Sequence, residues 1–197
     1  MATYEVKLNG VVVGTIPNTG DKVNDAVAGQ QLIKDLGLHK VISKAQVAMG
    51  QARAFADTAA HLYERGLKLG AVVPTTMVPF VVNSAFAIEM YLKTLSEAHG
   101  LKARGHVFIK IFDPLPEDTK DRLEALAPQF AMQYKAETFS TFRGALAVLE
   151  GAFVAWRYLH EDDSPLTFDV PLAIAVLATL HERCREVVPA IGESGLA

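Results

Sequence analysis

The N-terminal part of the chain has the pattern of a β-hairpin. Apolar and charged residues alternate over Tyr4–Leu8, and a second β-rich run covers Val11–Ile16. The dipeptide Asn9-Gly10 separates them, and this dipeptide favours a tight turn in which both residues take positive φ. Because an isolated two-stranded hairpin is only marginally stable in water, we expect it to lie on the helical body or to pair with another chain.

The rest of the chain shows apolar residues at helical spacing. Ser43 and Asp169 are suited to cap helices, Gly37 and Gly100 to end them, and prolines to start or stop them. The alanine-rich stripe of the second helix would let another helix approach closely. The expected helices cover about 23–36, 43–66, 79–99, 106–112, 116–127, 141–158 and 169–188.

These elements predict an all-α protein, an up-and-down bundle of four to five main helices with a small N-terminal β-hairpin. Residues 1–40 would hold the hairpin and a short helix, 41–190 the bundle, and 191–197 a tail. A chain of 197 residues, half of them apolar, has the size of one domain with a small appendage.

Charge and cysteine content narrow the class of protein. The net charge of −3 lacks the general basic character of proteins that live on nucleic acid, although a local basic patch is compatible with it. Cys184 is the only cysteine, which favours a reducing compartment. The first ten residues do not have the pattern of a secretory signal, and the apolar segment 172–180 is half the length needed to cross a bilayer. We therefore expect a soluble, cytoplasmic protein without membrane contact.

Three motifs in order give the chain a resemblance to a known family. An apolar helical stretch, 86–93, carries the acid Glu89; Gly105-His106 then precedes an aliphatic-aromatic run; and a later helix carries Arg157-Tyr158. This arrangement, spread over 45–163, resembles the HEPN family, the small helical domains named for nucleotide binding in higher eukaryotes and prokaryotes.

The resemblance implies a bundle of four or five helices that usually dimerises. It also implies either RNA cleavage in toxin–antitoxin and phage-defence systems or non-catalytic sensing and scaffolding. Ribonuclease members carry an Arg and a His separated by four to six residues. Here Arg104 and His106 are separated by one residue, Arg157 and His160 by two, and Arg53 and His61 by seven, so no pair fits.

The first functional hypothesis is therefore a non-catalytic or divergent HEPN-like homo-oligomer. It would bind RNA, a nucleotide or a protein partner in a bacterial stress or defence setting. One alternative is a metal-independent endoribonuclease with its Arg and His in non-standard positions. Another is a dimeric scaffold with no ligand.

Five residues are candidates for the site. Glu89 lies among apolar neighbours, and a buried carboxylate is costly unless it is paired. It would either act as a general acid or base or bind a cation, for which Arg157 is the natural partner. Arg157, with Tyr158, could instead grip a phosphate. His106 could hold a phosphate, carry a proton or cap a helix, and His160 could act beside Arg157 on one phosphate.

Metal and cofactor sites receive little support from the sequence. His160 and the acids 161–163 could ligate a metal, but they also suit a solvated helix end. His181 and Cys184 lie one turn apart, yet no second close pair of soft ligands completes a zinc site. Nucleotide-binding glycine loops are absent from the sequence. We therefore expect neither a metal nor a cofactor.

Overall fold

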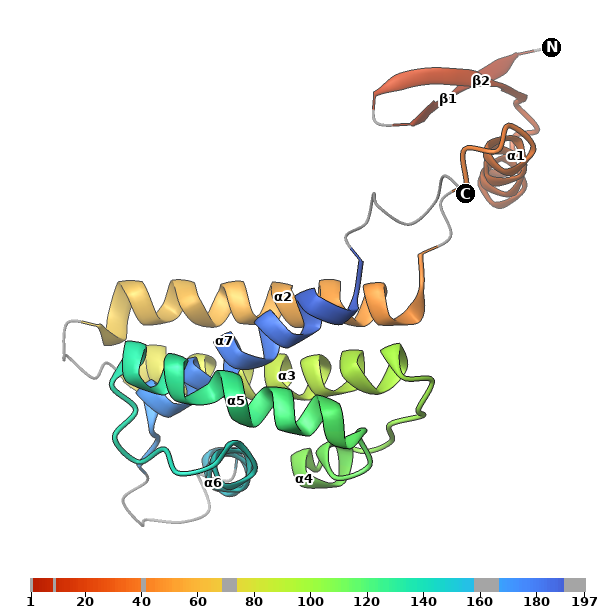
Figure 1. Cartoon of the computed structure of the whole chain (residues 1–197). Coiled ribbons are helices and arrows are strands. Elements are labelled where there is room, and N and C mark those ends of the chain that lie inside the picture. Colours follow the sequence, from red (N-terminus) through yellow and green to blue (C-terminus); the bar gives the residue numbers. More distant parts are fainter. Residues whose placement is uncertain (1, 9, 40–41, 69–73, 158–166, 190–197) are drawn as a thin grey trace. The chain divides into compact units, whose positions relative to one another are not determined.

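The computed structural model describes residues 2–8, 10–39, 42–68, 74–157 and 167–189. The chain forms two compact units, Met1–Ile42 and Ser43–Ala197 (Figure 1). The first holds two strands and one helix, and the second is built from helices in its described part.

The N-terminal unit is a hairpin covered by its own helix. Strand β1 (Thr3–Leu8) pairs antiparallel with β2 (Val11–Pro17), and Gly10 in the turn has a φ of 82°. Helix α1 (Lys22–Asp35) packs against β2. The buried Gly29 of α1 lies over Val6 of β1 and Ile16 of β2, and a Cβ added there would make ordinary van der Waals contact with both. The predicted hairpin is confirmed, and the cover that it needs comes from α1.

The second unit is arranged around one central helix. Helix α3 packs against α2, α4, α6 and α7, and α5 packs against α7. The core consists of large apolar side chains from these helices, among them Phe80, Leu92, Leu123, Leu146 and Leu180. The elements are α2 (Lys44–Leu62), its π-helical continuation η1 (Tyr63–Leu67), α3 (Pro74–Ala98), α4 (Phe108–Phe112), α5 (Glu117–Tyr134), α6 (Phe142–Arg157) and α7 (Val170–Val187). The predicted all-α bundle with an N-terminal hairpin is confirmed.

Side chains cap several helices. Ser43 accepts from the backbone of Gln46 and forms a capping box at the start of α2, and Asp169 accepts from the backbone of Leu172 in α7. At α6, both oxygens of the Glu124 carboxylate accept backbone N–H groups from the first turn. The caps at Ser43 and Asp169 were predicted from local sequence, whereas the long-range cap by Glu124 was not.

Two predicted boundaries at prolines are wrong. Helix α3 begins at Pro74 and contains Pro79, and α5 runs through Pro128 instead of stopping before it. Each proline removes one intrahelical hydrogen bond and crowds the preceding turn, which costs about 3 kcal/mol. The apolar stripe continues past both prolines and is buried, with Phe80 in α3 and Ala131 in α5, so tertiary packing sustains each helix.

Helix α3 is also long and apolar enough, over Thr75–Ala98, to cross a membrane by length and composition. More than half of that segment is buried inside the bundle, where it contacts four other helices. This burial is typical of the core helix of a soluble protein.

Candidate functional site

Glu89 is buried in α3 and has two positively polarised partners. Its carboxylate accepts a hydrogen bond from Lys93 Nζ at 2.7 Å, one turn further along the helix. Both of its oxygens also lie 3.0 Å from His106 Nδ1, in the loop between α3 and α4. The structure thus brings together two of the residues predicted for the site, Glu89 and His106.

The remaining predicted residues lie at the end of α6 and beyond it. Tyr158 and His160 lie outside the described residues, and of Arg157 only the helical backbone is described. The expected pair between Glu89 and Arg157 therefore stays a prediction. Glu89 is nevertheless balanced by Lys93 and His106, so the expectation that this buried acid is paired is confirmed.

The contact with Glu89 fixes how His106 faces solvent. The His106 side chain is 77% exposed, and Nδ1 is directed at the carboxylate. In the neutral tautomer that suits this contact, Nδ1–H donates to Glu89 and Nε2 is left as an acceptor. When protonated, the same ring presents a second N–H and a positive charge. His106 is therefore oriented either to accept a proton or to donate to an anion.

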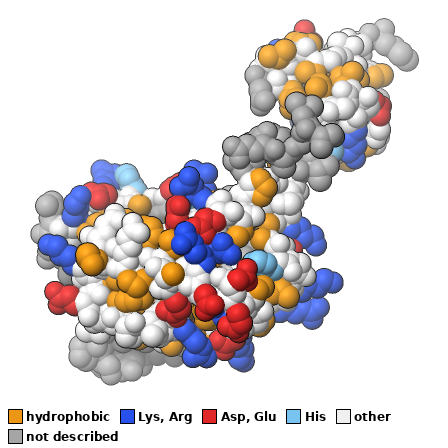
Figure 2. Space-filling view, viewed as in Figure 1, with side chains coloured by type: hydrophobic (Ala, Val, Ile, Leu, Met, Phe, Trp, Pro, Cys, Tyr) orange, Lys and Arg blue, Asp and Glu red, His pale blue; other side chains and the backbone are white. Residues whose placement is uncertain are grey.

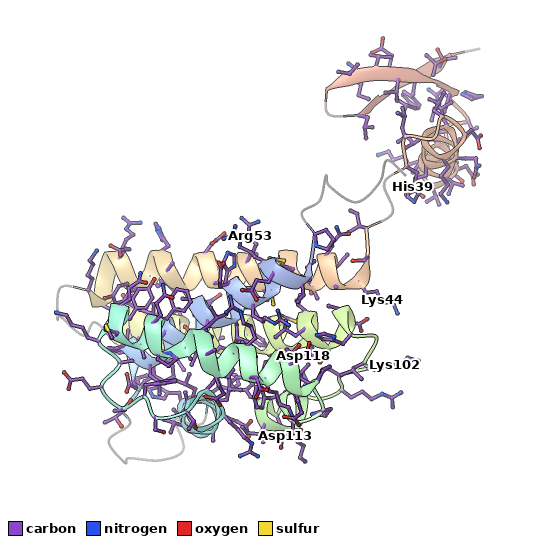
Figure 3. All side chains as sticks on the ribbon, in the orientation of Figure 1. His39, Lys44, Arg53, Lys102, Asp113 and Asp118 are labelled. Atoms are coloured by element: carbon purple, nitrogen blue, oxygen red, sulfur yellow. The ribbon has the colours of Figure 1, made fainter. Side chains whose placement is uncertain are left out.

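His106 belongs to a short basic segment, which we call the α3–α4 basic loop: Lys102, Arg104, His106 and Lys110. Between residues 101 and 112 the sequence contains no acid. Lys102, Arg104 and Lys110 are exposed, and none forms an ion pair with a described carboxylate. Figure 3 shows Lys102 projecting from the body of the protein. The positive charges of Lys102, Arg104 and Lys110 are thus not neutralised by contact with a described carboxylate, whereas His106 contacts Glu89.

Charges elsewhere on the helical unit show the opposite arrangement, both on α5 and α7 and between α6 and the end of α4. Arg122 and Arg183 both bind the carboxylate of Glu186, and Arg143 binds Asp113. Hydrogen bonds from the arginines hold the pKa values of Glu186 and Asp113 below their ordinary range. Acidic and basic side chains accordingly alternate over much of the face in Figure 2. Charges there neutralise one another, which makes this surface a weaker candidate for binding an ion.

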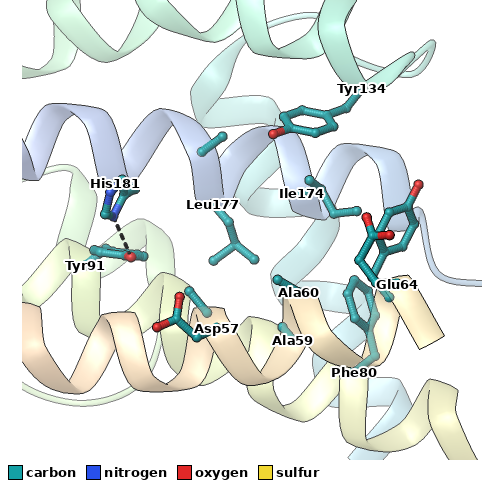
Figure 4. Close-up of a pocket in the computed structure, with 13 residues that line it drawn as sticks. Asp57, Ala59, Ala60, Glu64, Phe80, Tyr91, Tyr134, Ile174, Leu177 and His181 are labelled. Carbon is teal, nitrogen blue, oxygen red and sulfur yellow. Dashed lines mark hydrogen bonds between the residues drawn. The ribbon is translucent and has the colours of Figure 1, made fainter. Parts of the chain in front are cut away.

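A second candidate site is a pocket of about 380 Å³ between α2, α3, α5 and α7 (Figure 4). At one end, Tyr91 Oη lies 2.9 Å from His181 Nδ1. Burial raises the pKa of the Tyr91 phenol, so its hydroxyl stays protonated. Burial also lowers the pKa of His181, aided by the positive charges of Arg53 and Arg185. The pair is therefore neutral near pH 7.

Sequence reasoning considered His181 only as a zinc ligand with Cys184. In the structure the Cys184 thiol is buried and directed at the backbone oxygen of Tyr91, 3.5 Å away. Among the described residues no group of three or more His, Cys, Asp or Glu side chains could hold a metal ion. Tyr91 belongs to the apolar stretch 86–93 in the sequence. Its hydroxyl needs a partner when it is buried, and this need is the sequence signal for a polar contact, which His181 makes in the structure.

No family model matches the chain, and no curated protein or solved structure shows significant similarity to it. The resemblance to the HEPN family thus rests on the order of motifs within 45–163, and it stays a prediction.

Proposed function

We propose that the helical unit is a non-catalytic, HEPN-like protein that binds RNA through its α3–α4 basic loop. The observation that carries this proposal is the local charge. Lys102, Arg104 and Lys110 are exposed and unpaired within a segment that has no acid, although the whole chain is acidic. A phosphate backbone is the ligand that such a segment attracts, since Lys and Arg neutralise phosphates in a sequence-independent way.

Arg104 and His106 give this loop different roles toward a phosphate. A guanidinium donates through two parallel N–H groups and can grip two phosphate oxygens at once. In its protonated form, His106 donates Nδ1–H to the Glu89 carboxylate and offers Nε2–H to an anion. Glu89 thereby acts as a positioning residue that is held away from the RNA.

The proposal extends to the cellular setting. We expect a cytoplasmic homodimer or larger assembly acting in bacterial stress or defence, as the family resemblance implies. Two copies would present two basic loops to one RNA strand, which strengthens binding through multivalency. Light scattering that gives a monomer at micromolar concentration would contradict the oligomeric part of the proposal without affecting the loop.

The test is fluorescence anisotropy with a labelled, mixed-sequence single-stranded RNA. The double variant Lys102→Gln/Arg104→Gln should bind at least about tenfold more weakly at low salt, because it removes two positive charges that neutralise phosphates. The slope of its log K against log salt should also be shallower by about 0.7 for each phosphate contact that is lost. The matched control Lys34→Gln/Arg53→Gln also removes one exposed, unpaired Lys and one such Arg. Equal RNA affinities of the two variants would refute the loop assignment. If a mononucleotide competes with the RNA at the same concentration of phosphate groups, the ligand is a nucleotide instead.

The contact between Glu89 and His106 favours a second candidate, a metal-independent endoribonuclease. Such cleavage needs a base for the 2′-hydroxyl proton and a cation for the phosphorane charge. His106 Nε2 and the guanidinium of Arg104 supply these two groups. Cleavage of RNA without added metal that is lost in His106→Gln but kept in His160→Ala would assign the activity to this loop. Loss in both Arg157→Ala and His160→Ala would assign it to the end of α6.

A further inference from the structure

The pocket between α2 and α7 exists because the facing side chains are small. Helices α2 and α7 both pack on α3 and contact each other only slightly. Ala56 and Ala60 of α2 face Ala178 of α7 across the pocket, and Phe80 and Tyr91 of α3 also line it. A volume of about 380 Å³ is within the range of about 300–1,000 Å³ that is typical of small-molecule sites.

The charged groups that line this pocket are acidic. Asp57 of α2 and Glu64 of η1 line the pocket, and none of the described residues in its lining is a Lys or Arg. Glu64 is paired with Lys68, whereas Asp57 forms no hydrogen bond or ion pair with a described residue. In Figure 4 the Asp57 carboxylate lies toward the end of the pocket that holds Tyr91 and His181. Asp57 is also exposed to solvent, so an unpaired carboxylate lies at the edge of a largely apolar pocket.

The aromatic lining has the same preference for positive charge. Tyr63, Phe80, Tyr91 and Tyr134 all contribute to the pocket, and the face of an aromatic ring attracts an ammonium group within about 6 Å of its centre. Arg53 lies one turn before Asp57, and its positive charge helps to lower the pKa of His181. Its side chain is not among the described residues that line the pocket. The pocket thus combines an anionic group, aromatic faces and neutral hydroxyls.

We propose that this pocket binds a small organic cation, an amine with an apolar body. Its ammonium group pairs with Asp57, and its body lies against Phe80, Ile174 and Leu177. Phosphate-bearing ligands are disfavoured because Asp57 and Glu64 would repel them. The site is consequently separate in chemistry from the α3–α4 basic loop, and this inference does not depend on RNA binding.

The test is isothermal titration calorimetry with 2-phenylethylamine and its neutral analogue 2-phenylethanol. The amine should bind the unaltered protein at least tenfold more tightly than the alcohol, which a charge contact of this kind would produce. Asp57→Asn should remove that preference. Asp118→Asn is the matched control, since Asp118 is an exposed carboxylate on α5 that forms no described ion pair and does not line the pocket.

A second variant separates the pocket from the surface charge. Ala60→Leu fills the cavity without changing any charge, and it should weaken amine binding as strongly as Asp57→Asn does. Amine binding that survives Ala60→Leu would place the ligand on the surface and overturn the assignment, as would equal affinities for amine and alcohol or the absence of binding. Tighter binding of Nα-acetyl-lysine amide than of 2-phenylethylamine would overturn the assignment of a small-molecule ligand in favour of a lysine side chain from a protein partner.

Discussion

Two Glu–Lys pairs in this protein share their spacing and contact distance but differ strongly in burial, and Glu89 has His106 as a second partner. In both pairs the Glu precedes the Lys by four residues. The Glu89–Lys93 contact is 2.7 Å, with side chains 7% and 22% exposed, and the Glu64–Lys68 contact is 2.8 Å, with side chains 56% and 55% exposed. Spacing and distance being equal, any difference in energy reflects the environment.

The expected free-energy cost depends on the environment in which the remaining charge is left when one partner is removed. Removing one partner of a fully buried ion pair costs about 3–5 kcal/mol. Lys93 is partly exposed and His106 still contacts Glu89 after Lys93 is removed, so we expect Lys93→Met to cost about 1–2 kcal/mol. The exposed pair Glu64–Lys68 should show a coupling energy indistinguishable from zero, because solvent screens it.

The measurement is a pair of double-mutant cycles followed by urea unfolding at neutral pH, with far-UV circular dichroism as the probe. One cycle uses Glu89→Gln and Lys93→Met, and the other uses Glu64→Gln and Lys68→Met. The coupling energy of the first should be about 1–2 kcal/mol with an unchanged m-value. Equal couplings in the two cycles would refute the reasoning that burial makes the Glu89 contact strong.

Three further predictions concern other parts of the bundle. Burial lowers the pKa of His181 in the folded protein below the ordinary value of 6.5. The neutral side chain therefore contributes stability above pH 6.5, and this contribution is lost as the pH falls through the pKa of the folded state. On acidification, the melting temperature should drop less in His181→Gln than in the unaltered protein. Cys184 is buried with a raised pKa, so a thiol reagent should react with it only after urea unfolding, and rapid reaction of the folded protein would contradict its burial. Replacing Pro128 by Ala restores a helical N–H and should raise the free energy of unfolding in urea by about 1 kcal/mol or more; a loss of stability would show that the proline is needed in α5.

Local signals predicted the element boundaries where the physics is local. Ser43 and Asp169 cap the backbone within three residues of their own positions, and Gly10 supplies the positive φ of the hairpin turn. Such features depend on few neighbours, and for that reason the sequence alone reveals them. The predicted hairpin and the start of α2 fall in this class.

The predicted helix boundaries at Pro79 and Pro128 are wrong because the local cost of a proline was not weighed against the stability gained from tertiary packing. A proline inside a helix costs about 3 kcal/mol, which is decisive for an isolated helix. The residues of α5 beyond Pro128 gain burial only if the helix continues, and they include Ala131, which is buried, and Phe130, which packs partly buried against the core. This burial offsets the cost of the proline, but it depends on tertiary packing that the sequence pattern alone does not give.

The site residues divide in the same way. The burial of Glu89 was predictable from its apolar neighbours on α3. Its partner Lys93 lies four residues further along the same helix, a spacing that the sequence shows, whereas its contact with His106 depends on how the loop to α4 folds back. Tyr91 and His181 are 90 positions apart in the chain. Helical periodicity places each on an inward face, but it does not give the register of α3 against α7, and the pocket arises from that register.

The two candidate sites occupy opposite sides of the same helix, and this geometry keeps their tests independent. Successive residues in an α-helix are rotated by about 100°, so Glu89 and Tyr91 point about 200° apart. Glu89 faces the α3–α4 basic loop through His106, and Tyr91 faces α7 through His181. A change at Asp57 should therefore leave RNA binding unaltered, and the loop variant Lys102→Gln/Arg104→Gln should leave amine binding unaltered. If either variant abolished both activities, a change in the packing of α3 would explain the result better than two separate sites.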